Sequence, residues 1–273
     1  MNDFILIMWK PFLACLILTG IHVYLGIHVI ERKVIFVDLA LAQIAALGTT
    51  CAILLGHDLH SGVTYWLSLS ATVLGAIVFS LTRTRHEKIP QEAIIGIVYA
   101  MAAASAVLIL SRSAEGDEHI RSMLVGNVLL VSMPEIIKIL VLYSLLGLFH
   151  WYFRRTFLLI STKPNLAFQR GMNVKFWDLI FYLTFGIVVT SSVQIAGVLL
   201  VFSFLIVPAA AAILFSTRLS TRLWLGWTIG TLVSFLGITL SYFLDFPTGA
   251  TIICVFGAML VVLAIIKNIK VRI

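Results

Sequence analysis

Two acidic residues stand within or at the edge of long apolar stretches, and these residues are the best placed to do chemistry. Asp38 lies inside one such stretch and Glu92 opens another. A carboxylate in a membrane span is costly to bury and usually faces a cavity, a cation or a partner. Either side chain could therefore bind a cation that crosses a membrane. Two structural alternatives remain open: Asp38 pairs with Arg32 or Lys33, and Glu92 stabilises the N-terminus of its own helix.

Two polar clusters lie between apolar stretches. The first places imidazoles and a carboxylate within four residues: His57, Asp58 and His60. These ligand types suit a divalent cation, although the same residues also suit a solvated polar turn. The second cluster is expected to meet a docking partner outside the membrane, or to act as a weak entry site: Asp117, Glu118 and His119.

The sequence lacks the common motifs of nucleotide binding and hydrolysis. GxxxxGK[ST], HExxH and GxSxG are all absent. The three cysteines, Cys15, Cys51 and Cys254, lie in separate apolar stretches and are expected to act as small core residues. We therefore expect the chain to move a substrate rather than transform it, with no catalytic residue of its own. If ATP drives the process, a separate chain must hydrolyse it.

The composition places these residues in membrane helices. Of 273 residues, 61% are hydrophobic and 11% charged, whereas soluble domains are about 45–50% apolar and 25% charged. Apolar runs of about 20 residues favour helices over strands. The sequence thus predicts one transmembrane domain over 1–273, all-α, with Pro208 breaking the backbone hydrogen-bond ladder of its span. About nine spans are expected, within a range of eight to ten: 8–30, 34–56, 62–82, 91–111, 134–153, 177–193, 195–216, 223–244 and 249–267.

The basic residues predict the orientation. If the loops alternate sides, one side receives 15 of the 19 Lys and Arg residues, Arg32 and Arg83 among them. That side is cytoplasmic by the positive-inside rule, which puts the N-terminus outside and the C-terminus inside a plasma (inner) membrane. The net charge of +7 comes from these loops, and no basic stripe with interleaved aromatics predicts nucleic-acid binding.

One cytoplasmic connection, Thr162–Lys175, contains a short amphipathic stretch followed by a glycine. Its composition fits an ordinary basic loop. It also fits a coupling helix that docks on an ATPase, formed by Leu166, Ala167, Arg170 and Gly171. In that case Gly171 is expected to supply a positive-φ helix cap.

Four blocks of the sequence resemble the metal-ion permeases of ABC importers, in the order and at the spacing of that family. The first begins at Ser192 and reads SVQIAGVLLVFSFLIVPAAAA, with a small-residue turn, an apolar run and a proline followed by small residues. The second is SYFLDFPTGA over 241–250. The third is the loop 166–171, and the fourth is EAIIG over 92–96. The resemblance runs along nearly the whole chain.

The second span departs from the family pattern. Many members carry an aspartate and then a histidine four residues later. Counting back from Gly48, Gln43 falls at the histidine position and Asp38 is displaced by one residue. Zinc prefers nitrogen and sulfur ligands, whereas a carbonyl oxygen suits manganese. The family implies a transported divalent metal ion, zinc first and manganese or iron as alternatives, with Asp38, Gln43 and Glu92 as transient ligands.

The resemblance also implies an assembly. A homodimer in the lipid membrane would surround the path, with two ABC ATPase subunits below it and a periplasmic or lipid-anchored metal-binding protein above it. ATP would bind the ATPase, and no tightly bound cofactor is expected on this chain. Two other functions remain open. A permease for a chelated metal or cobalamin would have a similar fold, and a secondary transporter would need paired intramembrane carboxylates, of which we count one, Asp38.

Overall fold

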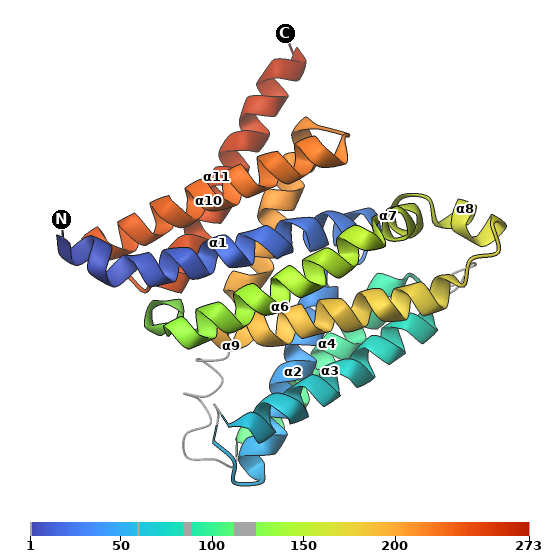
Figure 1. Ribbon diagram of the computed structural model, residues 1–273, viewed down its shortest axis with the longest axis horizontal. Helices are drawn as coiled ribbons and strands as arrows, with labels where there is room; N and C mark the ends of the chain where they lie inside the picture. The colour runs from blue at the N-terminus through green and yellow to red at the C-terminus, as the bar shows by residue number, and fades with distance from the viewer. Residues whose placement is uncertain (1, 59–60, 84–88, 112–123, 273) are drawn as a thin grey trace. The chain divides into compact units, whose positions relative to one another are not determined.

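The computed structural model describes residues 2–58, 61–83, 89–111 and 124–272, which form helices joined by short connections (Figure 1). Within these ranges there is no β-strand, so the all-α prediction is confirmed. The helices in chain order are α1 (Asn2–Glu31), α2 (Val37–Leu54), α3 (Gly62–Thr82), α4 (Gln91–Leu110), the 3₁₀ turn η1 (Val128–Leu130), α6 (Met133–Tyr152), α7 (Arg154–Thr162), α8 (Pro164–Gln169), α9 (Val174–Phe215), α10 (Leu219–Leu244) and α11 (Thr248–Arg272).

Eight of the described helices are long and apolar enough to cross a membrane, which lies within the predicted range of eight to ten. The difference from nine comes from α9, which has 42 residues and joins two predicted spans. The backbone of α9 departs from helical geometry at Gly197, where φ is 74° and ψ is 162°. Side chains disfavour that conformation, so glycine is needed there. Each arm of α9 on either side of Gly197 has about the length required for one crossing.

At Pro208 the hydrogen-bond ladder lacks one N–H, as expected, but the helix is not interrupted there. Pro208 lies inside the second arm of α9, and Gly197 is the residue of α9 with non-helical angles. Proline removes one backbone hydrogen bond, and membrane helices tolerate that loss where neighbouring groups compensate. The helix therefore continues through Pro208.

The chain forms two compact units that alternate along the sequence. The first unit comprises 1–30, 125–147 and 195–273, and the second comprises 31–124 and 148–194. Helices α6 and α9 contribute to both. The expectation of one permease domain over 1–273 stays a prediction.

In the first unit, α1 packs against the second arm of α9 and against α10. Val23 and Ile27 of α1 form a buried cluster with Ala209 of α9, and the indole N–H of Trp227 on α10 donates to the carbonyl of Gly20 at 3.0 Å. At Gly197 the chain passes directly against Gly126, where a Cβ on either glycine would collide with the backbone of the other. Small residues therefore set the closest approach in this unit, as is common in membrane helices.

In the second unit, α2 is the most enclosed helix. Of its hydrophobic window 72% is buried, compared with 22% for α4. Polar side chains link the neighbouring helices: Ser68 donates to the carbonyl of Ala45 at 2.9 Å, and the hydroxyls of Thr72 and Thr190 lie 3.0 Å apart. This enclosure decides the environment of every polar residue on α2.

Candidate metal site

Asp38 lies in the first turn of α2 and is 1% exposed. Neither oxygen of its carboxylate has a hydrogen-bond partner among the described residues. An unpaired ionised carboxylate is very costly to bury, so this side chain takes either a proton or a cation. A divalent ion accepts carboxylate oxygens readily, so the side chain fits a cation ligand.

The sequence left open whether Asp38 pairs with Arg32 or Lys33. In the structure, Arg32 does not pair with Asp38. The guanidinium of Arg32 is instead paired with Asp178 on α9. Lys33 is exposed, and within the described ranges it forms no ion pair with Asp38. The position of Asp38 inside the helix bundle is therefore not explained by a structural ion pair.

Glu92 lies in the first turn of α4, and its carboxylate reaches across to the start of α2. Its Oε1 accepts a hydrogen bond from the backbone N–H of Phe36 at 3.0 Å. Its Oε2 has no partner in the described part of the chain. Since Phe36 precedes Asp38 by two residues, Glu92 and Asp38 lie at the same end of α2. Glu92 thus joins α4 to α2 and keeps one oxygen available.

Gln43 is 8% exposed and lines a cavity of about 190 Å³ together with residues of α4, among them Tyr99 and Ala103. It follows Asp38 by five residues, and α-helical residues advance by about 100° each. Gln43 and Asp38 therefore project on different faces of α2. The structure does not bring them onto one face as an i, i+4 pair would lie.

The proposed outer clusters are only partly visible. His57 and Asp58 are exposed, and the backbone carbonyl of Asp58 accepts from the Thr64 hydroxyl at 2.7 Å, in the turn that leads into α3. This geometry agrees with the alternative of a solvated polar turn. Four of the predicted residues fall outside the described ranges: His60, Asp117, Glu118 and His119. Among the described residues, no three His, Cys, Asp or Glu side chains are grouped as metal ligands.

The amphipathic stretch of the predicted coupling segment forms α8, and α7 precedes it. Helix α8 ends at Gln169 and is capped as expected by Gly171, where φ is 70°. The N–H of Gly171 donates to the carbonyl of Phe168, and the N–H of Met172 donates to that of Ala167, in a Schellman motif. Ala167 is fully buried against Ile160 and Val174, so it anchors α8 to α7 and α9.

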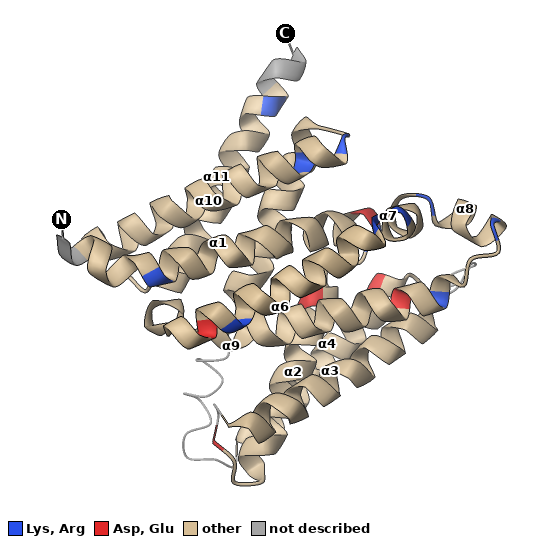
Figure 2. Cartoon of the chain, in the orientation of Figure 1, with Lys and Arg blue, Asp and Glu red and all other residues tan. Residues whose placement is uncertain are grey.

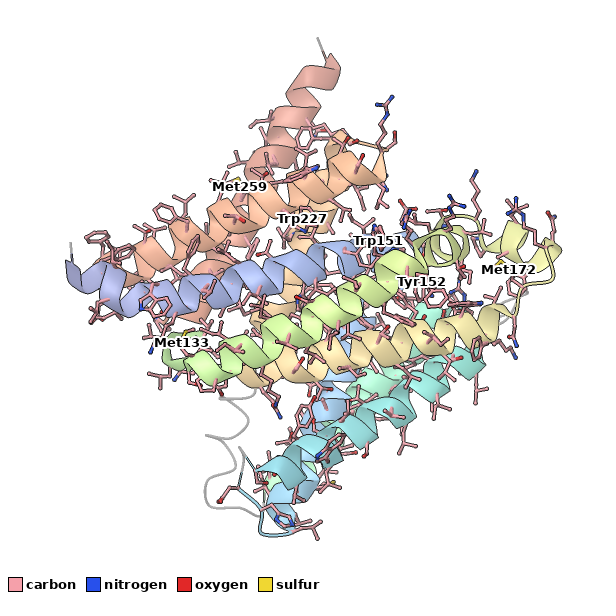
Figure 3. All side chains as sticks on the ribbon, viewed as in Figure 1. Met133, Trp151, Tyr152, Met172, Trp227 and Met259 are labelled. Carbon is pink, nitrogen blue, oxygen red and sulfur yellow. The ribbon has the colours of Figure 1, made fainter. Side chains whose placement is uncertain are left out.

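The other predicted coupling residues lie nearer the surface. Arg170 and Gly171 are exposed and Leu166 is half-buried, so these three are able to meet a partner. Figure 2 shows charged residues gathered at helix ends and around α7 and α8. Trp151 and Tyr152 close α6 just before α7 with exposed rings (Figure 3). Such aromatic residues are typical of a membrane–water interface, which places α7 and α8 beyond the span.

Sequence analysis missed a second buried carboxylate. Asp178 lies inside α9 and is fully buried. Arg32 Nη1 lies 2.5 Å from its Oδ1, and Arg83 Nη1 lies 2.8 Å from each of its oxygens. The count of one intramembrane aspartate is therefore wrong. Arg32 and Arg83, which we expected in cytoplasmic loops, have buried side chains that neutralise Asp178.

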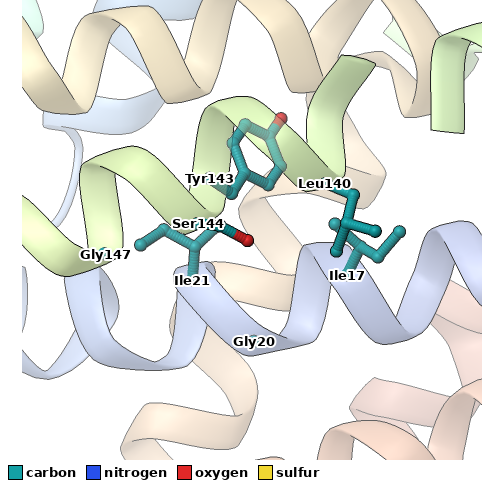
Figure 4. A pocket seen from close by; sticks show the side chains of 7 residues that line it. All are labelled: Ile17, Gly20, Ile21, Leu140, Tyr143, Ser144 and Gly147. Atoms are coloured by element: carbon teal, nitrogen blue, oxygen red, sulfur yellow. The ribbon is translucent and has the colours of Figure 1, made fainter. Parts of the chain in front are cut away.

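The first unit contains an apolar crevice of about 250 Å³ between α1 and α6 (Figure 4). Ile17, Ile21 and Leu140 dominate its lining, and the side chains of Tyr143 and Ser144 add hydroxyl groups. Nearby in the same unit, a ring nitrogen of His22 lies 2.8 Å from the Leu18 carbonyl of its own helix. The lining of this crevice contains no carboxylate, histidine or cysteine, so the candidate site is the one in the second unit.

Comparisons with known proteins agree with the sequence motifs. The model of the ABC 3 transport family matches residues 5–268. The chain is 27% identical over 235 residues to the manganese transport system membrane protein MntC of Listeria monocytogenes. The aligned region covers 85% of this chain and 80% of that relative. It is 26% identical over 259 residues to the chelated iron transport system membrane protein YfeD of Yersinia pestis, with 86% of each chain covered.

A solved structure has the same fold. PsaBC from Streptococcus pneumoniae, in complex with Fab, contains a chain that matches with a TM-score of 0.79 at 20% identity. The match covers 96% of this chain and 94% of that one. This likeness confirms the helical membrane fold expected from the sequence, and the family model confirms the resemblance to ABC transport proteins.

Proposed function

Since the chain belongs to the ABC 3 transport family, we propose that it is the membrane-spanning subunit of an ATP-driven importer for a divalent transition-metal ion. The observation that supports this most directly is Asp38, whose buried carboxylate has no partner among the described residues. A weakly held ion can be released again, because an open set of ligands does not trap it as a closed tetrahedral site would. Asp38 acts here as a transient ligand within the path.

The ligand set favours manganese or ferrous iron over zinc. Asp38 and Glu92, which lie at the same end of α2, offer oxygen donors, whereas zinc prefers nitrogen and sulfur. Two relatives carry names that refer to manganese and to chelated iron. The family resemblance put zinc first. An uptake experiment has to decide between zinc and these two ions.

A bare ion fits the cavity beside Gln43 better than a chelate would. The cavity beside Gln43 measures about 190 Å³, which is below the 300–1,000 Å³ typical of pockets for drug-sized ligands. A secondary transporter is also disfavoured. It would require paired titratable carboxylates in the membrane, and the second carboxylate, Asp178, is already neutralised by two arginines.

The assembly follows the family. We propose a homodimer in the inner (plasma) membrane, with the N-terminus outside and the C-terminus in the cytoplasm. An ABC ATPase subunit binds ATP and docks on α8, where Leu166, Arg170 and Gly171 reach the surface. A periplasmic or lipid-anchored metal-binding protein delivers the ion on the other side, close to the turn that holds His57 and Asp58.

The experiment is uptake by proteoliposomes that contain the chain with its ATPase and metal-binding protein. Radioactive manganese, iron(II), zinc and a cobalamin are offered separately, with ATP or with a non-hydrolysable analogue. ATP-dependent uptake of manganese or iron(II), at least tenfold above the analogue, is the expected result. Uptake of cobalamin alone, or metal uptake that an ion gradient drives without ATP, would contradict the proposal.

A further inference from the structure

A buried cluster of charges joins four segments of the second unit. It consists of Asp178 on α9, Arg32 after the end of α1, Arg83 after the end of α3, and Ser161 on α7. Arg32 donates from Nε to the Ser161 hydroxyl at 2.8 Å and from Nη1 to the Asp178 carboxylate. Arg83 donates to the same carboxylate at 2.8 Å. The side chains of Arg32 and Asp178 are fully shielded from solvent, so these interactions are not screened as surface ion pairs are.

The Ser161 end of the cluster belongs to the segment that carries α8. Ile160, next to Ser161, packs on Ala167 of α8 and on Val174 at the start of α9. The ring of Trp177, next to Asp178, packs against Phe157 of α7 with ring centroids 5.7 Å apart. These contacts join α7, α8 and the start of α9 into one packed block. A displacement of α8 would therefore also move Asp178.

The other end of the cluster leads toward the candidate metal site. Tyr182 lies one helical turn after Asp178, and its hydroxyl is 3.2 Å from Nε2 of Gln91 at the start of α4. The residue after Gln91 is Glu92, whose carboxylate accepts from the N–H of Phe36. A route of hydrogen bonds and chain neighbours thus runs from α7 through α9 and α4 to Phe36, which immediately precedes α2 and stands two positions before Asp38.

The charge balance of the cluster makes it sensitive to displacement. Two guanidinium groups face one carboxylate, and the surplus positive charge of Arg32 rests on the ring of Phe181, 3.9 Å from its centroid. A buried charge that loses its partner is strongly unfavourable. The four segments are therefore held in one arrangement until a sufficiently large force moves the block as a whole.

We propose that Asp178 is a positioning residue that transmits movement of α8 to the start of α2, so that ATP-driven displacement of α8 changes access to Asp38. The inference rests on the proposed function, because it takes α8 as the ATPase docking helix and Asp38 as the ion ligand. Asp178 does not itself touch the ion. It keeps α7, the start of α9 and the segments that carry Arg32 and Arg83 moving together.

The test compares coupling rather than activity alone. In the reconstituted complex, metal ions taken up per ATP hydrolysed are measured for the wild type and for Asp178→Asn. Transmission through Asp178 predicts that this ratio falls at least tenfold while the ATPase still copurifies and ATP hydrolysis continues. A residue with a purely structural role would lower uptake and hydrolysis together, so an unchanged ratio would overturn the inference.

A milder variant keeps the test decisive should Asp178→Asn fail to insert. Tyr182→Phe removes one hydroxyl from the route and leaves the buried ring in place, and it should lower the ratio about threefold. Thr184 lies on α9 like Tyr182, and its hydroxyl is 2.8 Å from Nε2 of His150 on α6. Thr184→Val is therefore the matched control and should leave the ratio unchanged. Equal ratios in all three proteins would refute transmission.

The same measurement distinguishes a failure of the proposed function from a failure of the transmission role of Asp178. If the wild-type complex takes up no metal with ATP, the proposed function fails. If it takes up metal and the ratio survives both Asp178→Asn and Tyr182→Phe, only the transmission role of Asp178 fails.

Discussion

Asp38 and Asp178 are buried carboxylates of the same unit, but their surroundings are opposite. Asp178 is met by two arginines, one of which also holds a hydroxyl of α7. Asp38 has no partner among the described residues, although it is as deeply buried. Burial alone therefore does not identify a functional carboxylate. The distinction lies in whether the protein supplies the compensating charge or leaves it to a ligand.

This contrast assigns different tasks to the two residues. A carboxylate already neutralised by two guanidinium groups has little left to offer a passing cation, but it fixes the segments that carry those groups. A carboxylate without a partner adds nothing to the stability of the empty protein and is available to a cation.

The largest effect is expected from Asp178→Leu. Removing one partner of a buried ion pair leaves uncompensated charge, which typically costs about 3–5 kcal/mol. Here the variant strands both Arg32 and Arg83. The free energy of unfolding of the purified chain in detergent should therefore fall by an amount of this order. A stability equal to that of the wild type would show that the two arginines are solvated and that the contrast with Asp38 is false.

Asp38→Leu should act in the opposite direction. The variant removes a buried acceptor that has no partner in the described chain, and such an unsatisfied group costs about 1–3 kcal/mol. The same unfolding assay should therefore show a gain in stability, together with a loss of metal uptake. A loss of stability comparable to that of Asp178→Leu would mean that Asp38 has a structural partner.

Gly171→Asp tests the α8 end of the transmission route. Aspartate, like asparagine, tolerates the left-handed conformation better than other side chains, so the variant keeps the helix cap and adds a negative charge beside the exposed Arg170. Copurification of the ATPase should fall at least tenfold while the chain remains inserted. Gly171→Asn is the matched control, since asparagine tolerates positive φ and carries no charge. Full retention of the ATPase by the aspartate variant would contradict docking on α8.

The smallest effect is expected at the outer turn. Asp58 is exposed and its backbone carbonyl, not its side chain, makes the hydrogen bond to Thr64. Asp58→Asn should therefore leave uptake within about twofold of the wild type at saturating metal-binding protein, because an exposed carboxylate contributes little. A tenfold loss would move the candidate site from Asp38 to this turn.

Much of the fold was readable from the sequence, because a membrane span reveals itself through length and apolar composition alone. The helix cap at Gly171 was predictable as well, since a glycine after a short amphipathic stretch is a local signal. The continuous 42-residue α9 was not. Its break depends on close approach to Gly126, a residue more than 60 positions away that no local pattern reveals.

The candidate site was only half readable. Asp38 stood out as a carboxylate in an apolar run, and Asp178 carried the same signal, because it too lies within a predicted span. The sequence did not reveal that Arg32 and Arg83 pair with Asp178. Arg32 and Arg83 are separated from Asp178 by 146 and 95 positions, and both resembled ordinary loop charges. Only the packing of the second unit reveals which aspartate is neutralised.

Direct measurement of ion binding tests the central claim most closely. The purified wild-type chain, Asp38→Asn and Asp178→Asn are titrated with Mn²⁺, and the free ion is followed by its electron paramagnetic resonance signal. Binding should weaken at least tenfold in Asp38→Asn and stay within about threefold of the wild type in Asp178→Asn. Wild-type binding by Asp38→Asn would contradict the assignment of the unpartnered carboxylate to the transported metal.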